Sequence, residues 1–303
     1  MPHRTRARCT PWFALAALGA ARLGAQSLAP STTATVAATG LAQLDAPLNG
    51  GGSFSWNGLL ATFDLDHQFS TTIAGSLSLR YELQRWHFAD SSALGAAPPW
   101  GAVNLPQVSA TIVYTPKPYL RFSLAPTMEW DFESRASTAD ALDYGAVVTA
   151  GMAFSRNFFI GIGAGIFYQV YETHVYPFPL IYWKISDRWK VTNAFTAGPA
   201  GGAGVEARYA ISATWEAAAG GSYRTYTWRL APDAPEEGGI GQNRFIPLFL
   251  RVGHTFAKSS RLDLYGAVLA DGQLTLRDPG GALLSQASYS AAPAIGLTFR
   301  SSF

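Results

Sequence analysis

The sequence predicts an all-β fold, a transmembrane antiparallel up-and-down β-barrel of about 14 strands, within a range of about 12–14. Three observations lead to this prediction. Apolar and polar residues alternate along many segments, short and longer connections alternate between these segments, and the chain ends on Phe303 in phase with an apolar row. The composition agrees, because only 14% of the 303 residues are charged while 13% are aromatic. Soluble domains carry about 25% charged residues.

The first 25 residues have the pattern of a secretory signal peptide. Arginines at positions 4, 6 and 8 precede a short apolar stretch over 12–21, and small residues follow. This pattern is typical of a segment that is removed during export. We expect cleavage after Ala25, with Ala29 as the alternative position and a retained helix as the alternative interpretation. The chain is then a signal peptide over 1–25 followed by a barrel over 26–303.

Loss of this signal peptide changes the charge balance and the cysteine content. Four arginines leave with it and no acidic residue does, so 18 basic residues remain against 20 acidic ones. No basic patch for nucleic acid is left, and we expect no nucleic-acid partner. Cys9 is the only cysteine, so the exported chain has neither disulfides nor thiolate metal ligands.

Alternation with a period of two is clearest in "YLRFSLAPTMEWDFE", residues 119–133. Even-numbered positions there are apolar and most odd-numbered ones are polar, which gives a strand one apolar and one polar face. The segments 73–84, 158–170 and 205–212 repeat the pattern. No stretch of the exported chain reaches the ~18 apolar residues that a membrane-spanning helix needs.

The connections between these segments alternate in length, as expected for a barrel with short turns at one end and longer loops at the other. Short joints are expected near 66–70, 115–119, 155–158, 186–189, 212–215 and 257–261, and longer ones at 45–53, 87–102, 133–141, 172–177, 199–203, 230–243 and 276–287. Thirteen strands are visible between Ser53 and Phe299. Because a single-chain bacterial barrel normally has an even strand number, "TTATVAATGLAQL" at 32–44 is predicted to be the fourteenth.

A secreted or periplasmic β-sandwich also alternates, so other features must favour a membrane. Aromatic residues gather towards strand ends, as in the girdles at the two lipid–water interfaces. The polar parity carries charge near strand centres, which a wet barrel lumen tolerates better than a tight core. The apolar row of Ile295, Leu297 and Phe299 continues to Phe303, although Ser301 departs from it.

Three stretches carry a family resemblance: "PFPLIYWKISDRWKVTNAFTAGPAGGAGVEARY", "GGSYRTYTWRL" and "APAIGLTFRSSF". They resemble an uncharacterised family of Gram-negative outer-membrane β-barrels, a domain of unknown function, over roughly residues 103–303. The resemblance implies the outer membrane of a bacterial cell as location, its lipid bilayer as partner, and recognition by the barrel-assembly machinery through the strand ending at Phe303. It carries over no catalytic residue.

The sequence predicts no catalytic, cofactor-binding or metal site, and no cofactor. Histidines 67, 87, 174 and 254 show no metal-ligand spacing. His174, near an outer loop, could serve a lipid-acting enzyme, but no serine motif accompanies it, and an interfacial histidine is the favoured interpretation. In "GIGAGIF", residues 161–167, the strand pattern continues through the glycines, which argues against a phosphate loop. Glycines on the lumen parity indicate close approach of something inside, or a bend in the wall.

Charged residues on the polar parity are the candidate functional set. We assign thirteen to the lumen: Arg80, Glu82, Arg121, Glu129, Asp131, Lys184, Lys190, Glu206, Arg208, Glu216, Arg224, Arg251 and Asp263. Seven are positive and six are negative. A balanced set favours cross-strand ion pairs that rigidify the wall, whereas part of it could line a passage for a small polar solute.

The bore of such a barrel is expected to be narrow. About eight strands leave a filled interior and sixteen or more leave an aqueous channel. Five bulky residues are expected to face inward and narrow it: Phe159, Phe167, Tyr171, Trp228 and Phe249. The acidic loop 230–243 is expected to fold over the mouth or inward. The sequence therefore favours a passive channel or small-solute uptake pore, with a non-conducting structural or surface-binding barrel as alternative and a lipid-acting enzyme third.

Overall fold

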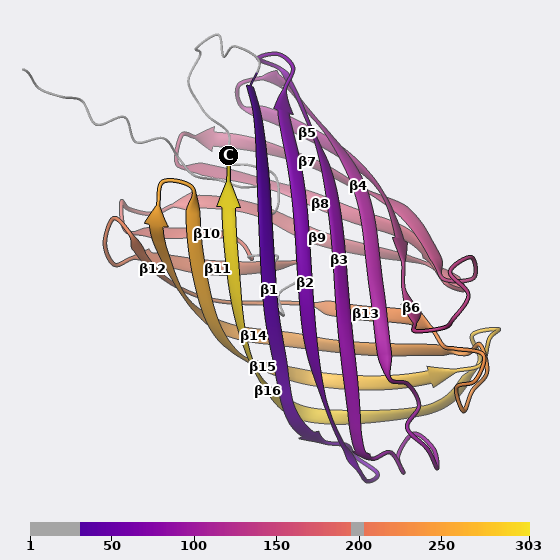
Figure 1. Cartoon of the computed structure of the whole chain (residues 1–303). Coiled ribbons are helices and arrows are strands. Elements are labelled where there is room, and N and C mark those ends of the chain that lie inside the picture. Colours follow the sequence, from indigo (N-terminus) through magenta and orange to yellow (C-terminus); the bar gives the residue numbers. More distant parts are fainter. Residues whose placement is uncertain (1–30, 195–202) are drawn as a thin grey trace, which may run out of the picture.

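The computed structural model, which describes residues 31–194 and 203–303, is a closed antiparallel β-barrel (Figure 1). The predicted signal peptide, both cleavage positions and most of the expected loop 199–203 lie outside the described residues. The described residues contain no helix, and hence no helix that could cross a membrane.

Sixteen strand segments make up the sheet. They are β1 (Ser31–Pro47), β2 (Ser53–Gln68), β3 (Ile73–Asp90), β4 (Ala102–Lys117), β5 (Leu120–Trp130), β6 (Phe132–Glu133), β7 (Leu142–Ser155), β8 (Phe158–Gln169), β9 (Glu172–Lys184), β10 (Trp189–Asn193), β11 (Gly204–Ala210), β12 (Trp215–Ser222), β13 (Arg224–Arg229), β14 (Ile240–Ala257), β15 (Ser260–Arg277) and β16 (Leu283–Ser302). Two interruptions, at Asp131 and Tyr223, split single strands into β5/β6 and β12/β13. The barrel therefore has 14 strands, as predicted, and the weak segment 32–44 is β1.

The barrel closes between the first and last strands, where β16 pairs antiparallel with β1. The N–H of Phe303 donates to the carbonyl of Ala34, and the N–H of Ala34 donates to the carbonyl of Phe303, both at 2.9 Å. Ile295, Leu297 and Phe299 point outward and are 40–52% exposed. The terminal aromatic residue thus completes the closing seam and continues an apolar outer face, because in hydrocarbon every backbone group must be paired.

The two ends of the barrel differ. One end, here the turn end, holds the start of β1, Phe303 and all six short turns at the expected positions; it lies towards the upper left of Figure 1. The opposite, loop end holds the longer connections. The prediction of a longer connection at 172–177 is wrong, because residues 170–171 make a tight turn and 172–177 belong to β9. Val170 adopts a φ of 51°, and its N–H donates to the Asp143 carboxylate at 2.6 Å, which holds that turn.

An apolar band with aromatic borders surrounds the turn-end half. Exposed rings near the turn end include Phe69, Tyr114, Phe154, Trp183, Trp215 and Phe256, and further along the strands lie Tyr81, Tyr144 and Tyr168. On β7, Tyr144 and Phe154 are ten residues apart. At about 3.3 Å per residue and a tilt near 45°, this is a band roughly 23 Å tall. Transmembrane barrels have an apolar band about 25 Å tall between aromatic girdles.

Beyond this band, towards the loop end, the polarity of the strands inverts. On β3, outward residues change from Leu77 and Leu79, which are apolar, to Arg85 and His87, while Trp86 turns inward and is buried. The inward residues here form an aromatic core, defined by Phe54, Trp56, Trp86, Phe88, Trp100, Tyr226, Trp228, Phe245 and Tyr289. This half of the barrel therefore resembles a soluble β-protein that projects from the band.

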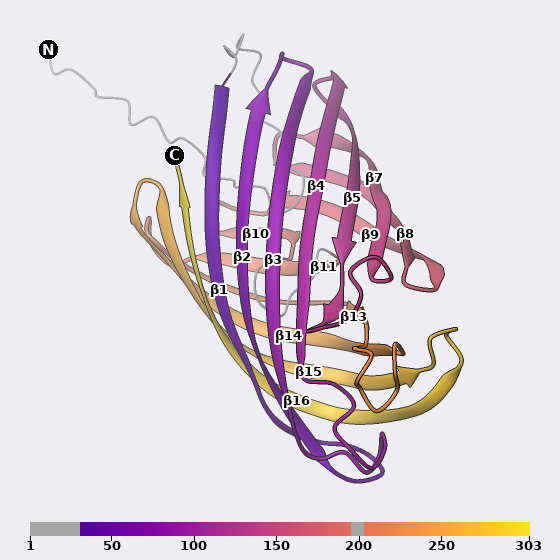
Figure 2. The same cartoon turned by 45° about the vertical axis from the view of Figure 1, so that its right-hand side comes forward.

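A bridge across the lumen encloses that core. β6 pairs antiparallel with β4, and Arg229 of β13 pairs in parallel with Phe132 of β6. The Arg229 N–H donates to the Asp131 carbonyl at 2.9 Å. Strands β1–β4, β6 and β13–β16 thus form a smaller closed ring at the loop end, where β14–β16 curve strongly (Figure 2). The expected loop 230–243 spans only 230–239, and its Leu230 folds inward into this core.

Glycines on the inner wall make room for aromatic rings, which is the close approach expected from the "GIGAGIF" pattern. A Cβ on Gly163 would lie 2.3 Å from the Phe178 ring, and one on Gly151 would lie 2.3 Å from the Phe159 ring. Such rings lie flat against the wall rather than across the lumen. Phe159 therefore narrows the bore less than the sequence predicted, whereas Trp228 lies in the aromatic core.

Two glycines of β15 give a matched test of this packing. In Gly272→Ala the new Cβ would lie 1.9 Å from the Tyr289 ring, while in Gly266→Ala it would meet nothing within 4 Å. We expect Gly272→Ala to lower the free energy of unfolding by about 1–3 kcal/mol through overpacking, and Gly266→Ala not to lower it. Urea unfolding in detergent micelles measures both, and equal stability of the two variants would contradict the packing described.

Candidate functional site

The thirteen predicted lumen charges lie in two groups, with three further residues outside them. One group, the turn-end ion network, contains Glu206, Arg208, Glu216, Arg251 and Asp263, joined by Arg261. The other lines a cavity halfway along the barrel and contains Arg80, Glu82, Glu129, Asp131 and Arg224. Lys184, Lys190 and Arg121 are half-buried on the same parity nearer the turn end. Lys184 donates to the exposed Asp187 of the adjacent turn at 2.6 Å.

Arg251 is the centre of the turn-end ion network. Its guanidinium lies 2.6 Å from Asp263, 2.9 Å from Glu206 and 3.2 Å from Glu216, and only 2% of the side chain is exposed. These partners come from β11, β12 and β15, on either side of β14 in the sheet. The network therefore runs along the wall from strand to strand, which is the geometry of cross-strand pairs that stabilise a sheet.

Arg261 was missed in the sequence, where residues 257–261 were expected to be a turn. Its guanidinium lies 2.8 Å from Asp263 and 2.9 Å from Glu216. The signal that could have found it is its parity, because Arg261 and Asp263 are two residues apart in β15 and must face the same side.

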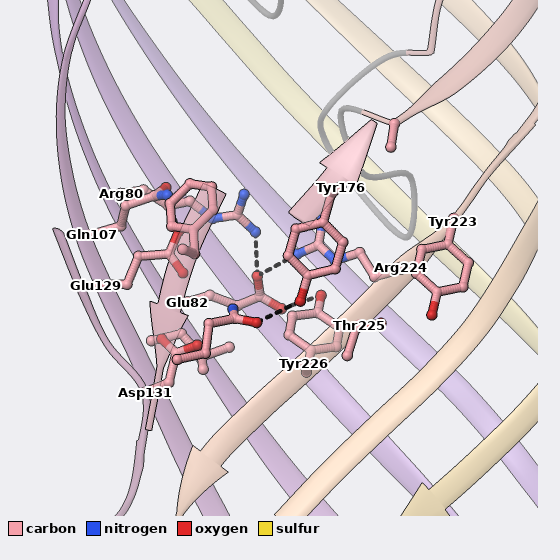
Figure 3. Close-up of a pocket in the computed structure, with 14 residues that line it drawn as sticks. Arg80, Glu82, Gln107, Glu129, Asp131, Tyr176, Tyr223, Arg224, Thr225 and Tyr226 are labelled. Atoms are coloured by element: carbon pink, nitrogen blue, oxygen red, sulfur yellow. Dashed lines mark hydrogen bonds and ion pairs between the residues drawn. The ribbon is translucent and has the colours of Figure 1, made fainter. Parts of the chain in front are cut away.

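The cavity has a volume of about 240 Å³ and lies between β3, β4, β5, β8, β9 and β13. Figure 3 shows its lining, in which charged residues are joined by Gln107, Gln169, Tyr176, Tyr223, Thr225 and Tyr226. These neutral groups were not singled out in the sequence. Gln107 and Tyr176 share the inward parity of their strands, but neutral polar and aromatic side chains carry no signal that separates a cavity from a filled lumen.

Glu82 is the most heavily bonded group in the cavity. Its Oε2 lies 2.5 Å from Arg80 and 3.4 Å from Arg224. Its Oε1 accepts hydrogen bonds from Tyr226 Oη and Gln84 Nε2, both at 2.8 Å. Two arginines therefore converge on one carboxylate, as the dashed lines of Figure 3 show.

Glu129 and Asp131 are bonded far more sparsely. Glu129 accepts a hydrogen bond from Gln107 Nε2. Asp131 is 6% exposed, and its backbone joins the strands around it: its N–H donates to Ala141 O at 3.1 Å. Within residues 31–194 and 203–303, no hydrogen bond reaches its carboxylate. These two carboxyl groups lie on one side of the cavity, and among the described residues neither forms an ion pair.

His174 lies at the loop end next to a glutamate and a tyrosine. His174 Nε2 lies 3.3 Å from Glu172 Oε1, and its ring stacks on Tyr176 with the ring centroids 5.8 Å apart. Among the residues the structure describes, no three His, Cys, Asp or Glu side chains are arranged to hold a metal ion. No serine is hydrogen-bonded to His174 in the same residues, so the geometry provides no hydrolytic pair.

Comparison with solved structures identifies the same architecture in outer-membrane channels. An outer-membrane channel from Pseudomonas putida F1 aligns with a TM-score of 0.50 and 9% identity, over 94% of this chain and 98% of that one. A deltaS2 mutant of the monoaromatic hydrocarbon channel TodX aligns with a TM-score of 0.50 and 7% identity, over 90% of each chain. No protein-family model matches the sequence, and no curated protein matches it. By its architecture, this chain has the fold of a 14-stranded transmembrane β-barrel.

Proposed function

We propose that this protein is a passive channel in the bacterial outer membrane, through which small polar solutes cross in the lumen. The observation that carries the proposal is the opposite polarity of the two faces in the banded half. Leu77, Leu79 and Tyr81 of β3 point outward and are exposed, while Ser78 and Arg80 point inward. An apolar outside with a polar inside is the arrangement of a membrane barrel with a wet lumen.

The course of the passage follows from what fills the rest of the lumen. The aromatic core occupies the ring of β1–β4, β6 and β13–β16 at the loop end. The cavity lies on the other side of β6 and β13, against β5, β8 and β9. We infer that solutes pass through this cavity, and that the restricted cross-section makes the channel narrow.

Further features support the location and assembly that we propose. The fold is shared with outer-membrane channels, and the 14 strands match the even number found in single-chain bacterial barrels. The final strand presents Leu297, Phe299 and Phe303 outward up to the last residue. We propose that the barrel-assembly machinery recognises this strand. No enzymatic activity is proposed, because the described residues offer no catalytic pair.

Planar-bilayer recording on purified, refolded protein tests the channel. We expect discrete conductance steps in the wild type. Thr225→Trp, which puts an indole into the cavity, should lower the step size because the passage is narrow there, whereas Thr173→Trp on the exposed outer face of β9 should leave it unchanged. A folded wild type without steps would contradict the proposal and would favour the non-conducting barrel.

A further inference from the structure

We propose that the cavity binds a small organic cation, a solute carrying a protonated amine, through the carboxylates of Glu129 and Asp131. This inference deepens the proposed channel function and rests on it, since it names the class of solute that the lumen selects.

The charged groups of the cavity are only partly paired with one another. Both arginines of the cavity, Arg80 and Arg224, are directed at Glu82, at 2.5 and 3.4 Å. Within the part of the chain that the structure describes, no Lys, Arg or His nitrogen lies within 4 Å of the Glu129 or Asp131 carboxylate. The cavity therefore holds two guanidinium groups and three carboxyl groups, and both carboxyl groups without an ion-pair partner lie on β5 or directly after it.

The burial of Asp131 makes its missing partner costly. The residue is 6% exposed, lines the cavity, and accepts no side-chain hydrogen bond from the described residues. Burying a charge is expensive unless it is paired and hydrogen-bonded. Its backbone is held on both sides, because the N–H donates to the Ala141 carbonyl and the carbonyl accepts from the Arg229 N–H, at 3.1 and 2.9 Å. A cation from outside the chain would supply the missing partner.

A neighbouring acid adds a further carboxyl group to this wall. Asp143 is fully buried on β7, and its Cα pairs with that of Glu129 across the sheet. Its Oδ1 accepts the Val170 N–H, whereas no hydrogen bond from the described residues reaches Oδ2. Arg229, the basic residue nearby on β13, donates hydrogen bonds from its guanidinium to the carbonyls of Asp140, Val170, Gly238 and Pro279. Its guanidinium is therefore hydrogen-bonded to backbone carbonyls and, among the described residues, forms no ion pair with Asp143.

The size and lining of the cavity favour an organic ammonium ion over a metal ion. Its volume of about 240 Å³ is somewhat below that of typical ligand pockets, and therefore suits a small solute. The rings of Phe167 and Tyr176 line it, and aromatic faces attract ammonium groups. The acids do not meet as a metal-binding cluster: among the described residues no such group of three exists.

Calorimetry on the full exported chain in detergent tests this site. The probe is butane-1,4-diamine, a dication at neutral pH, and the comparison compound is butane-1,4-diol, which has the same chain length and no charge. We expect the wild type to bind the diamine and not the diol. Asp131→Asn should weaken diamine binding at least about tenfold, because a hydrogen bond between charged groups is lost.

Asp233→Asn is the matched control, since it removes one negative charge by the same substitution in the exposed loop 230–239. It should bind the diamine as the wild type does. Glu129→Gln, which keeps the size of the side chain, provides the second variant if Asp131→Asn fails to fold. Equal binding of diamine and diol, or unchanged binding in a folded cavity variant, would overturn the inference.

Bilayer recording on the same preparation separates this inference from the proposed function. A wild type that conducts but does not bind the diamine would support the channel and contradict the amine site. A wild type that binds the diamine but never conducts would support the amine site and contradict the channel.

Discussion

Replacing Arg251 with methionine should lower the free energy of unfolding by about 3–5 kcal/mol, because it leaves buried carboxylates without their shared partner. Glu206 and Asp263 are both fully buried and both lie within 3 Å of the Arg251 guanidinium. Arg208 and Arg261 would retain contact with these acids but would not fill the centre of the network. The measurement is equilibrium urea unfolding in detergent micelles, followed by tryptophan fluorescence.

The control for this prediction is Asp187→Asn, which breaks the Lys184–Asp187 pair in a turn where Asp187 is 96% exposed. Exposed pairs contribute little to stability, so this variant should have the same free energy of unfolding as the wild type. If Arg251→Met is no less stable than Asp187→Asn, the turn-end ion network does not stabilise the wall as described.

Replacing Trp228 with alanine should lower the free energy of unfolding by about 3–5 kcal/mol and should also enlarge the conductance. Trp228 is fully buried in the aromatic core, with ring centroids 5.0 Å from Trp100 and 5.5 Å from Trp86. Its removal opens a void inside the ring that the aromatic core closes. Urea unfolding and planar-bilayer recording measure the two effects on one preparation.

Trp215→Ala is the matched control, because Trp215 lies on the outer face near the turn end and is 45% exposed. It should change the conductance little. A loss of stability in Trp228→Ala with an unaltered step size would contradict the second expectation and would mean that the void inside the ring opens no second path beside the cavity.

The strands and their order were predictable from the sequence because lipid imposes a simple rule. Every outward residue of the band meets hydrocarbon, so the alternation of "YLRFSLAPTMEWDFE" appears in β5 with the even-numbered residues on the outer face. The short turns were equally visible. The strand count followed from the even number required of a single-chain barrel, which placed β1 on the weakest of the 14 patterns.

The inversion of polarity towards the loop end was not predicted, although the sequence contains its signal. In β3 the apolar parity changes from odd at Leu83 to even at Trp86 and Phe88. Read as one membrane strand, this change looks like noise in the pattern. In a strand that leaves the membrane, the change marks the point where water replaces lipid on the outer face and an aromatic core replaces water on the inner face.

The cavity could be predicted only in part. Parity alone placed its charged residues inward, but Glu82 pairs across the lumen with Arg224, 142 residues later in the chain. Such a contact depends on the bridge between β6 and β13, where two strands break at Asp131 and Tyr223. Neither break has a glycine or proline at its centre, so local residue propensities do not predict either of the two breaks.

Spin labels at single cysteines along β3 test most directly the claim that alternate residues of one strand meet lipid, lumen and, further along, water. With Cys9 replaced by serine, labels at Leu77 and Leu79 should be accessible to oxygen in reconstituted bilayers, and a label at Ser78 should not be. A label at His87, on the outer face beyond the band, should be accessible to a water-soluble nickel chelate. Equal accessibility of Leu77, Ser78 and Leu79 to the nickel chelate would contradict the membrane barrel.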